Sequence, residues 1–344
     1  MKAIPLSLMT LYADLSQRLA LQETRPGSIS TKTTKGKKYL YAVHKDGQAR
    51  VQRYLGPVDD DEAKAEAERI RRAEAEAKEL RSLVSTLKQA RIPAPTLVQG
   101  RILEVVANAG LFERGLTLVG TVAYQTYACV IGAYLGASAY ATNGIDFSVA
   151  EFVAGEGQAD IGSILKRADP KFEPHWHAND KLPRIFKTPT ILVDVITSFG
   201  RGRKSPILLK ELGCSAAALA YQEYLVEDTI DVVALYGRGV LVRVPRPVRF
   251  ALHKLLVAQH RGPTERAKRQ KDLRQARELL DILIEIDEAT FQDSLDDARA
   301  RGKSWKTAIN ASLREMGRDA RQGHLPLPTK ASSQPANEKS PRVR

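Results

Sequence analysis

Polar and hydrophobic positions alternate with period two in the first part of the chain and change to a helical pattern soon afterwards. Residues 37–55 alternate on both sides of Asp46-Gly47, which predicts a β-hairpin. Residues 59–87 begin with three aspartates and consist mainly of Ala, Glu, Lys and Arg. We expect a helix there that is polar around most of its circumference and that connects the hairpin to the body or lies across its surface.

Short apolar runs become frequent from Leu97 onward and predict buried strands between helices. Pro93 and Pro95 interrupt the chain just before this change, so the main boundary is expected there. The predicted strands are residues 116–119, 145–149, 190–196, 229–236 and 240–244. The predicted helices are residues 97–111, a segment after Gly120-Thr121, residues 212–225 and four segments between 250 and 318.

These elements predict an α/β (α+β) fold with additions at both ends of a mixed-sheet core. An N-terminal β-hairpin and a charged helix precede the core, and a helical bundle follows it. The expected parts are an N-terminal helix and hairpin module at 1–57, a charged connecting helix at 58–95, the core at 96–247, the bundle at 248–322 and a disordered basic tail at 323–344.

The charge balance favours anionic partners. Lys and Arg outnumber Asp and Glu by 53 to 40, which gives a net charge of +13. Such an excess attracts nucleotides and nucleic acids, although charges confined to solvated helices and the tail would say little about function. Cys129 and Cys214 are too few for a disulfide framework, and residues 1–21 lack a long apolar run. We therefore expect a cytoplasmic protein without a membrane partner.

Two basic segments are compatible with nucleic-acid binding, but their composition is not specific to it. The hairpin at 37–55 combines tyrosines with lysines and arginines, which suits RNA such as tRNA, or DNA. An ordinary small sheet packed on the charged helix explains this composition equally well. The run Gly-Arg-Gly-Arg-Lys at 200–204 suits contacts with phosphates. His175 and His177 lack suitably spaced cysteines, so zinc is not expected.

Two acids and a Gly-Thr turn form the most specific constellation. The first core strand leads into a helix through Gly120-Thr121, Asp146 lies on the next predicted strand, and Asp194 lies on a later one. Carboxylates on neighbouring strands bind divalent cations, and a glycine turn at a helix N-terminus binds phosphates. The strand, Gly-Thr and helix unit by itself is common in α/β proteins.

Asp194 is informative because it interrupts an apolar strand. A buried carboxylate needs a partner, a metal ion or a shifted pKa. An ion pair with Lys254 would also satisfy it, so the residue alone does not decide between a structural and a chemical role.

The order of these parts resembles the nucleotidyltransferase superfamily of the DNA polymerase β type. The resemblance covers residues 97–276 and is carried by LVGTVAYQTYACVIG, ILVDVITS, VPRPVRFALHKLLVAQHR and KRQKDLRQA. It extends to bacterial nucleotidyltransferase-like proteins and to the abortive-infection toxins of toxin–antitoxin systems. It implies a nucleotidyltransferase-type mixed sheet. In that case Gly120 and Thr121 belong to the phosphate loop, Asp146 is a metal ligand, and Asp194 is the third carboxylate or the general base. Lys254 would face the triphosphate, and Lys271 and Asp272 would lie beside the nucleotide.

One position departs from the pattern of that superfamily. Gly144 stands where the first aspartate of an Asp-x-Asp pair is expected, and Ser148 on the same strand face is neutral. A hydroxyl cannot replace a carboxylate that bridges two hard cations. Three explanations compete: inactivation of an active enzyme, a member that binds nucleotide without turnover, or a shifted frame in which the loop acid Glu156 substitutes.

The resemblance implies a transferase that uses Mg²⁺ or Mn²⁺ to move a nucleoside monophosphate from an NTP to an RNA or protein acceptor. Gly144 is expected to impair that activity. The alternative is a catalytically inactive nucleotidyltransferase-fold protein that binds nucleic acid or has a regulatory role. A protein acceptor or an antitoxin is the expected protein partner.

Overall fold

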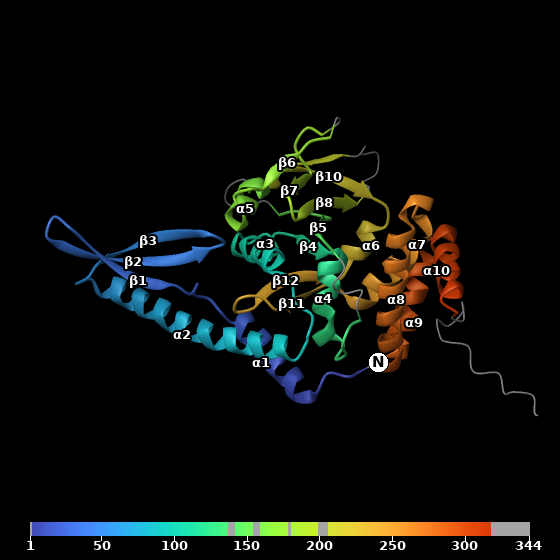
Figure 1. Cartoon of the computed structure of the whole chain (residues 1–344), viewed down its shortest axis with the longest axis horizontal. Coiled ribbons are helices and arrows are strands. Elements are labelled where there is room, and N and C mark those ends of the chain that lie inside the picture. Colours follow the sequence, from blue (N-terminus) through green and yellow to red (C-terminus); the bar gives the residue numbers. More distant parts are fainter. Residues whose placement is uncertain (1, 137–141, 154–158, 178–179, 199–205, 318–344) are drawn as a thin grey trace, which may run out of the picture.

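The computed structural model describes residues 2–136, 142–153, 159–177, 180–198 and 206–317. The predicted tail at 323–344 lies outside these ranges. Within them, no helix is both long enough and apolar enough to cross a membrane. Figure 1 shows a three-stranded sheet and a long helix at one end, a larger sheet in the middle and a helical bundle at the other end.

The N-terminal part contains one strand more than the sequence predicts. Its elements are α1 (Leu6–Ala20), β1 (Ser28–Thr34), β2 (Lys37–Asp46), β3 (Ala49–Pro57) and α2 (Asp61–Gln89). The predicted hairpin is confirmed as β2 and β3, which pair antiparallel up to Asp46 and Ala49. β1 was missed because its sequence SISTKTT is polar and has no apolar alternation, yet it pairs with β2 along its length.

The α2 helix covers one face of this sheet. Its N-terminus is capped by Asp60, which accepts a hydrogen bond from the Ala63 amide at 3.2 Å. Ala63 and Ala67 allow close approach and form a small buried cluster with Leu40. The charged surface of α2 faces solvent, as the sequence predicts, while its second half joins the main core through Leu80, Val84 and Leu87.

The central sheet brings together strands that are distant in sequence. Its order is β4-β5-β8-β10-β9, and β7 pairs with β6 and β8. β5 and β8 are parallel, whereas β4 and β5 are antiparallel. The sheet is therefore mixed, as predicted. The strands are β4 (Leu116–Val119), β5 (Gly144–Val149), β6 (Glu173–His175), β7 (Ile185–Lys187), β8 (Leu192–Ser198), β9 (Ile207–Leu209) and β10 (Cys214–Leu219).

The prediction of a helix at 212–225 is wrong. Cys214–Leu219 forms β10 instead, and the helix α6 begins only at Gln222. The alanines at 216–218 favour a helix locally, but pairing with both β8 and β9 fixes this segment as a strand. A short 3-10 helix at Lys210–Leu212 precedes it.

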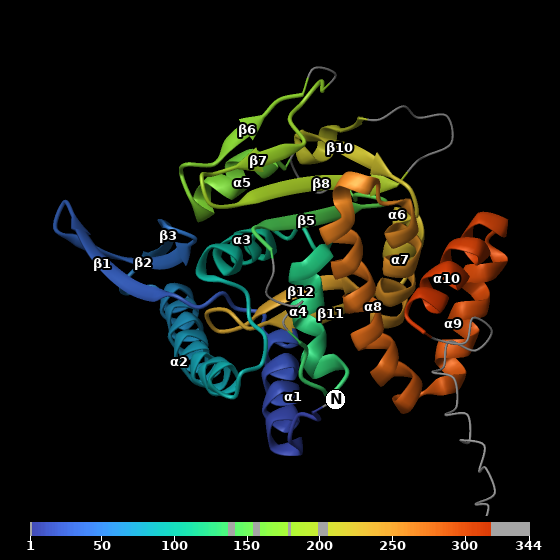
Figure 2. The same ribbon diagram turned by 45° about the vertical axis from the view of Figure 1, so that its right-hand side comes forward.

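Helices and a separate hairpin enclose the central sheet. They are α3 (Leu97–Asn108), α4 (Gly120–Val130), α5 (Ile161–Ala168), α6 (Gln222–Glu227) and the antiparallel pair β11 (Thr229–Ala234) and β12 (Val240–Pro245). The bundle consists of α7 (Pro247–His260), α8 (Arg266–Ile286), α9 (Glu288–Ala300) and α10 (Lys303–Glu315), with a 3-10 turn at Pro263–Glu265. Figure 2 shows α4, α7 and α8 beneath β5 and β8.

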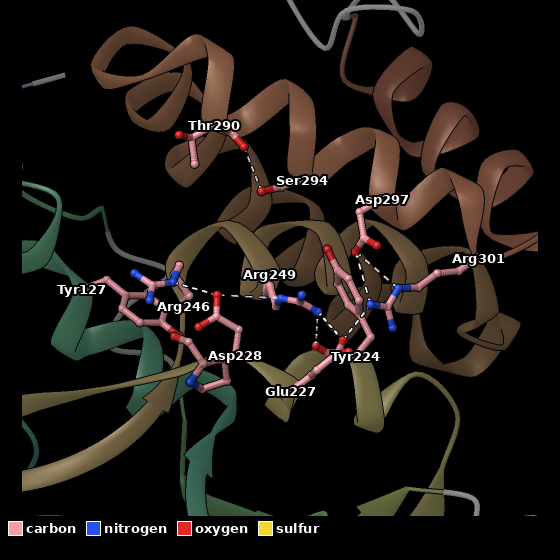
Figure 3. A network of polar contacts seen from close by, with 11 residues as sticks. Tyr127, Tyr224, Glu227, Asp228, Arg246, Arg249, Thr290, Ser294, Asp297 and Arg301 are labelled. Carbon is pink, nitrogen blue, oxygen red and sulfur yellow. Dashed lines mark hydrogen bonds and ion pairs between the residues drawn. The ribbon is translucent and has the colours of Figure 1, made fainter.

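Ion pairs join the bundle to the core (Figure 3). Glu227 of α6 accepts hydrogen bonds from Arg249 of α7 at 2.7 Å and from Arg301 after α9 at 2.6 Å. Arg246 donates to Asp228 at 2.8 Å. Each such partly exposed pair contributes up to about 1 kcal/mol, but the shared carboxylate links three segments. The network fixes the position of α7, which carries one of the candidate site residues.

Candidate functional site

Asp146 and Asp194 lie side by side in the central sheet. They are direct partners in the register of the parallel strands β5 and β8. Residues in register on neighbouring strands point to the same face, so the two side chains share one side of the sheet. The structure thus brings together two acids that are 48 positions apart in the chain.

The Gly120 turn adjoins this pair. β4 ends at Val119, the register partner of Asp146, and α4 begins with Gly120. Gly120 has a φ of +69°, and a Cβ atom added there would overlap the Asp146 carboxylate. Only glycine gives both this backbone conformation and this close approach. Thr121 follows and is buried, with 4 % of its surface exposed.

Burial and mutual repulsion shift the acids toward their protonated forms. Burial raises the pKa of Asp194 to about 6, the neighbouring Asp146 charge adds to this rise, and the positive charge of Arg184 opposes it. Asp194 Oδ1 is buried and has no hydrogen-bond partner in the described part of the chain. Burial also raises the pKa of Asp146, although Lys254 and Lys271 oppose the rise. A buried acceptor without a donor is a group that a cation would satisfy.

Lys254 does not form the ion pair with Asp194 that the sequence left open. Lys254 Nζ donates to Asp272 Oδ1 at 2.6 Å, and Arg261 Nε donates to Asp272 Oδ2 at 3.1 Å. Burial would raise the pKa of Asp272, but these cations hold it below its usual range. Burial and the Lys254 charge lower the pKa of Lys271. Asp272 therefore positions cations whose field reaches Asp146.

Three nearby residues were absent from the predicted set. Arg261 completes the cradle of Asp272, Arg184 acts on Asp194, and His253 lies next to Lys254 on α7. Burial and the Lys254 charge lower the pKa of His253 to about 3, so it is neutral. The run VRFALHKLL predicts a largely apolar helix, and nothing in this pattern indicates that its histidine is buried near the site. Arg184 follows Pro183 in a segment without a regular pattern.

Two carboxylates, one of which has an oxygen without a hydrogen-bond partner in the described part of the chain, fit a single hard cation. Carboxylate oxygens are the ligands that Mg²⁺ and Mn²⁺ prefer. No cluster of three or more His, Cys, Asp or Glu side chains suited to a metal occurs among the described residues. The rings of His175 and His177 are in edge-to-face contact, with centroids 5.1 Å apart, and are not part of such a cluster. Asp146 and Asp194 would hold one ion, and the donor set does not fit the two-ion cage.

The position of the missing ligand is open in the structure. Gly144 pairs with Leu192, and among the described residues an added Cβ atom would meet only the Leu192 carbonyl oxygen at 3.4 Å. Ser148 does not substitute, since its hydroxyl is fully buried and donates to Gln222 Oε1 at 3.3 Å. Glu156 and the basic run at 200–204 lie outside the described residues.

Two parts of the chain match known protein families. Residues 98–300 match the family described as "Nucleotidyltransferase", and residues 6–65 match a domain of unknown function, DUF6788. No curated protein matches the chain. A crystal structure of ANT(2")-Ia with adenylyl-2"-tobramycin is 14% identical, covers 58% of this chain and 94% of its own, and has a TM-score of 0.31.

A second solved structure is an antigenic nucleotidyltransferase-like protein from Paracoccidioides brasiliensis. It is 15% identical, covers 68% of this chain and 93% of its own, and has a TM-score of 0.31. The family match spans more than half of the chain and includes Gly120, Asp146, Asp194 and Lys254. The resemblance stated from the sequence is therefore confirmed, and the chain belongs to the nucleotidyltransferase family.

Proposed function

We propose that the protein binds a nucleoside triphosphate with Mg²⁺ or Mn²⁺ and transfers its nucleoside monophosphate to an RNA or protein acceptor. The observation that carries this proposal is the in-register pair Asp146 and Asp194 beside the Gly120 turn. Lys254 and Lys271 supply positive charge near this pair, since the charges of both lower the pKa of Asp146. Nucleotidyl transfer depends mainly on positioning and on neutralising the triphosphate charge, which this arrangement supports.

Each residue has a separate role in the proposed reaction. The main-chain amides of Gly120 and Thr121 at the N-terminus of α4 bind phosphate oxygens. Asp146 and Asp194 hold the cation, which when bound screens the triphosphate charge. Lys254 and Lys271 face the phosphates, and Asp272 keeps Lys254 in place through the 2.6 Å contact.

Asp194 also accepts or orients the proton of the acceptor. The acceptor hydroxyl oxygen forms a bond to the α-phosphorus, the bond from that phosphorus to the bridging oxygen breaks, and pyrophosphate leaves. The hydroxyl proton passes to the Asp194 carboxylate. In the metal-free protein burial raises the pKa of Asp194 to about 6, so its carboxylate accepts a proton more readily than an exposed aspartate does.

A second candidate function is a catalytically inactive nucleotidyltransferase-fold protein that binds nucleic acid or has a regulatory role. The observation that favours it is Gly144, which leaves two carboxylates where the superfamily pattern has three. In this case the fold and the basic charge are retained, and label transfer is absent.

Incubation with labelled NTPs separates the two functions. The protein is supplied with each NTP, Mn²⁺ and either RNA or a protein acceptor, and labelled products are resolved on gels. A labelled product that the unmodified protein forms and Asp194→Ala does not form supports the transferase. Asp59→Asn is the matched control, because this exposed acid lies far along the chain from the site. Salt-sensitive nucleic-acid binding without any labelled product supports the inactive alternative.

Gly144→Asp tests the site assignment itself. The open position accommodates the new side chain, which lies on the strand face of Asp146. We expect at least tenfold tighter Mn²⁺ binding and a matching gain in transfer, because a hard cation gains a third carboxylate. Unchanged Mn²⁺ affinity in a folded variant would contradict the assignment of Asp146 as a ligand.

A further inference from the structure

The three-stranded sheet at the N-terminal end has one face that no part of the described chain covers by a hydrophobic contact. Its other face packs on α2 through Leu40, Ala63 and Ala67, with Ile29 alongside. Because side chains alternate along each strand, the residues between these positions point away from α2. Figure 1 shows the sheet extending from the body, and Lys32, Lys37 and Lys45 on this outward face are exposed.

Cations and tyrosines occupy the outward face, and acids do not. The register places Lys32 opposite Tyr39 and Lys45 opposite Arg50. The outward face is formed by Ser28, Ser30, Lys32, Thr34, Lys37, Tyr39, Tyr41, Val43, Lys45, Arg50, Gln52 and Tyr54. In the described part of the chain, no carboxylate forms an ion pair with any of its four cations. The face therefore has an uncompensated positive charge that is complementary to a polyanion.

The tyrosines form one cluster at the centre of this face. The Tyr54 ring lies 6.0 Å from that of Tyr39 and 5.5 Å from that of Tyr41, measured between centroids. Lys32 Nζ lies 4.7 Å from the centroid of Tyr41. Tyr54 remains 53 % exposed, and α2 already supplies the hydrophobic contact on the opposite face. Exposed rings flanked by cations are the surface on which unpaired bases stack.

A cationic cavity of about 430 Å³ lies where the sheet meets α2 and the body, and its lining includes the outward-face residues Ser28 and Val43. Lys45 and Arg50 line it from the sheet, and Arg25, Arg81 and Arg238 line it from the surrounding segments. Arg238 Nη1 is buried and has no hydrogen-bond partner among the described residues. Burial lowers the pKa of this guanidinium. An anionic oxygen would supply the missing acceptor.

The cavity also contains two acids, which only partly balance its charge. Glu74 accepts a hydrogen bond from Arg81 at 2.8 Å. Burial raises the pKa of Glu104, against the lowering effect of Lys45 and Arg238. Five cations against two acids leave the cavity positive. A phosphate there lies next to the sheet residues that follow the tyrosine cluster along β2.

We propose that the outward face and the cavity together bind a single-stranded segment of nucleic acid. Its bases stack on the tyrosine cluster, and its phosphates lie along the cations and enter the cavity. A single strand fits better than a duplex, because the bases of a duplex are stacked on each other and cannot reach the rings. This surface indicates a single-stranded nucleic acid as the partner. Whether that strand is also the acceptor of the nucleoside monophosphate rests on the proposed transfer.

Fluorescence anisotropy with the full chain tests the proposal without NTP or metal. The probes are a labelled single-stranded RNA of about 20 nucleotides and the matching duplex. We expect the single strand to bind more tightly than the duplex. The logarithm of its binding constant should fall linearly with the logarithm of the salt concentration. The triple variant Lys32→Gln, Lys45→Gln, Arg50→Gln should reduce the salt slope by about 2, since each phosphate contact on a single strand contributes about 0.7.

A matched triple variant on α2 controls for total charge. Arg69→Gln, Arg71→Gln and Lys78→Gln remove three exposed cations from the helix behind the sheet. We expect this variant to keep the salt slope of the unmodified protein. An equal reduction in both triple variants would show attraction by net charge alone and would overturn the assigned surface.

A variant that keeps hydrophobic bulk isolates the stacking contribution. Tyr54→Leu should fold normally and weaken the single strand at least about fivefold. Equal affinity of Tyr54→Leu and the unmodified protein would overturn the role of the cluster, as would preference for the duplex. Asp194 lies outside this surface. Loss of transfer in Asp194→Ala with intact strand binding would therefore show that the transfer site and the binding surface fail separately.

Discussion

Replacing Asp194 by Asn should stabilise the metal-free protein at neutral pH. The native carboxyl is buried beside Asp146, and these two effects raise its pKa from 3.8 to about 6. The unfolded chain has neither effect. Ionising Asp194 in the folded state therefore costs free energy that a neutral amide of the same shape does not incur.

The magnitude follows from the pKa difference between the folded and unfolded states. Between pH 3.8 and about 6 the folded protein binds the proton more tightly, so its stability falls as pH rises. A difference of about 2 pKa units corresponds to about 3 kcal/mol. This cost is absent below the unfolded pKa and fully present above the folded pKa. Asp194→Asn should therefore gain about 3 kcal/mol at neutral pH and almost nothing in acid.

Urea unfolding between pH 3.5 and 8, in a metal chelator, measures this difference. Asp59→Asn is the matched control, because it removes the same charge from an exposed site. Addition of Mn²⁺ should stabilise the unmodified protein and have little effect on Asp194→Asn, because the cation binds the folded state through this carboxylate. A stability difference that does not change with pH would refute the reasoning.

Three further substitutions test contacts of the site and of the N-terminal module. Gly120→Ala places a methyl group against Asp146 at a φ of +69°, so we expect about 1–2 kcal/mol less stability in urea unfolding and weaker NTP binding. Lys254→Met removes one cation from the buried Asp272 carboxylate, and we expect a loss of about 3 kcal/mol in the same assay. Gly47→Ala, at a φ of +62°, forces a methyl group into a main-chain carbonyl of α5, so limited proteolysis should cleave the N-terminal module faster.

Matched controls accompany these substitutions. Gly36→Ala has a φ of +77°, and no atom of the described residues lies within 4 Å of the added Cβ atom, so it shares only the backbone strain. Equal losses in Gly36→Ala and Gly120→Ala would contradict the close approach to Asp146. Lys268→Met removes an exposed lysine that pairs with Glu265. Equal losses in Lys268→Met and Lys254→Met would contradict the importance of the buried pair.

Local patterns in the sequence determined the type of most elements in the core. Period-two alternation around Asp46-Gly47 identified β2 and β3, and apolar runs identified β5 and β8. Such patterns record which side of an element is buried, and that information is present within a few neighbouring residues. The run at 190–196 singled out Asp194, because a carboxylate within an apolar strand is costly without a partner. Asp146 was identified by its order after the Gly120-Thr121 turn and by the family resemblance.

Tertiary structure alone decided which of these elements and side chains meet. β1 has no apolar pattern and β10 contains an alanine run, so both depend on pairing with strands elsewhere in the chain. The register that aligns Asp146 with Asp194, and the choice of Asp272 over Asp194 as the partner of Lys254, join residues from different elements. Local sequence carries little information on such pairings, because their free energy depends on burial and geometry that exist only after the chain has folded.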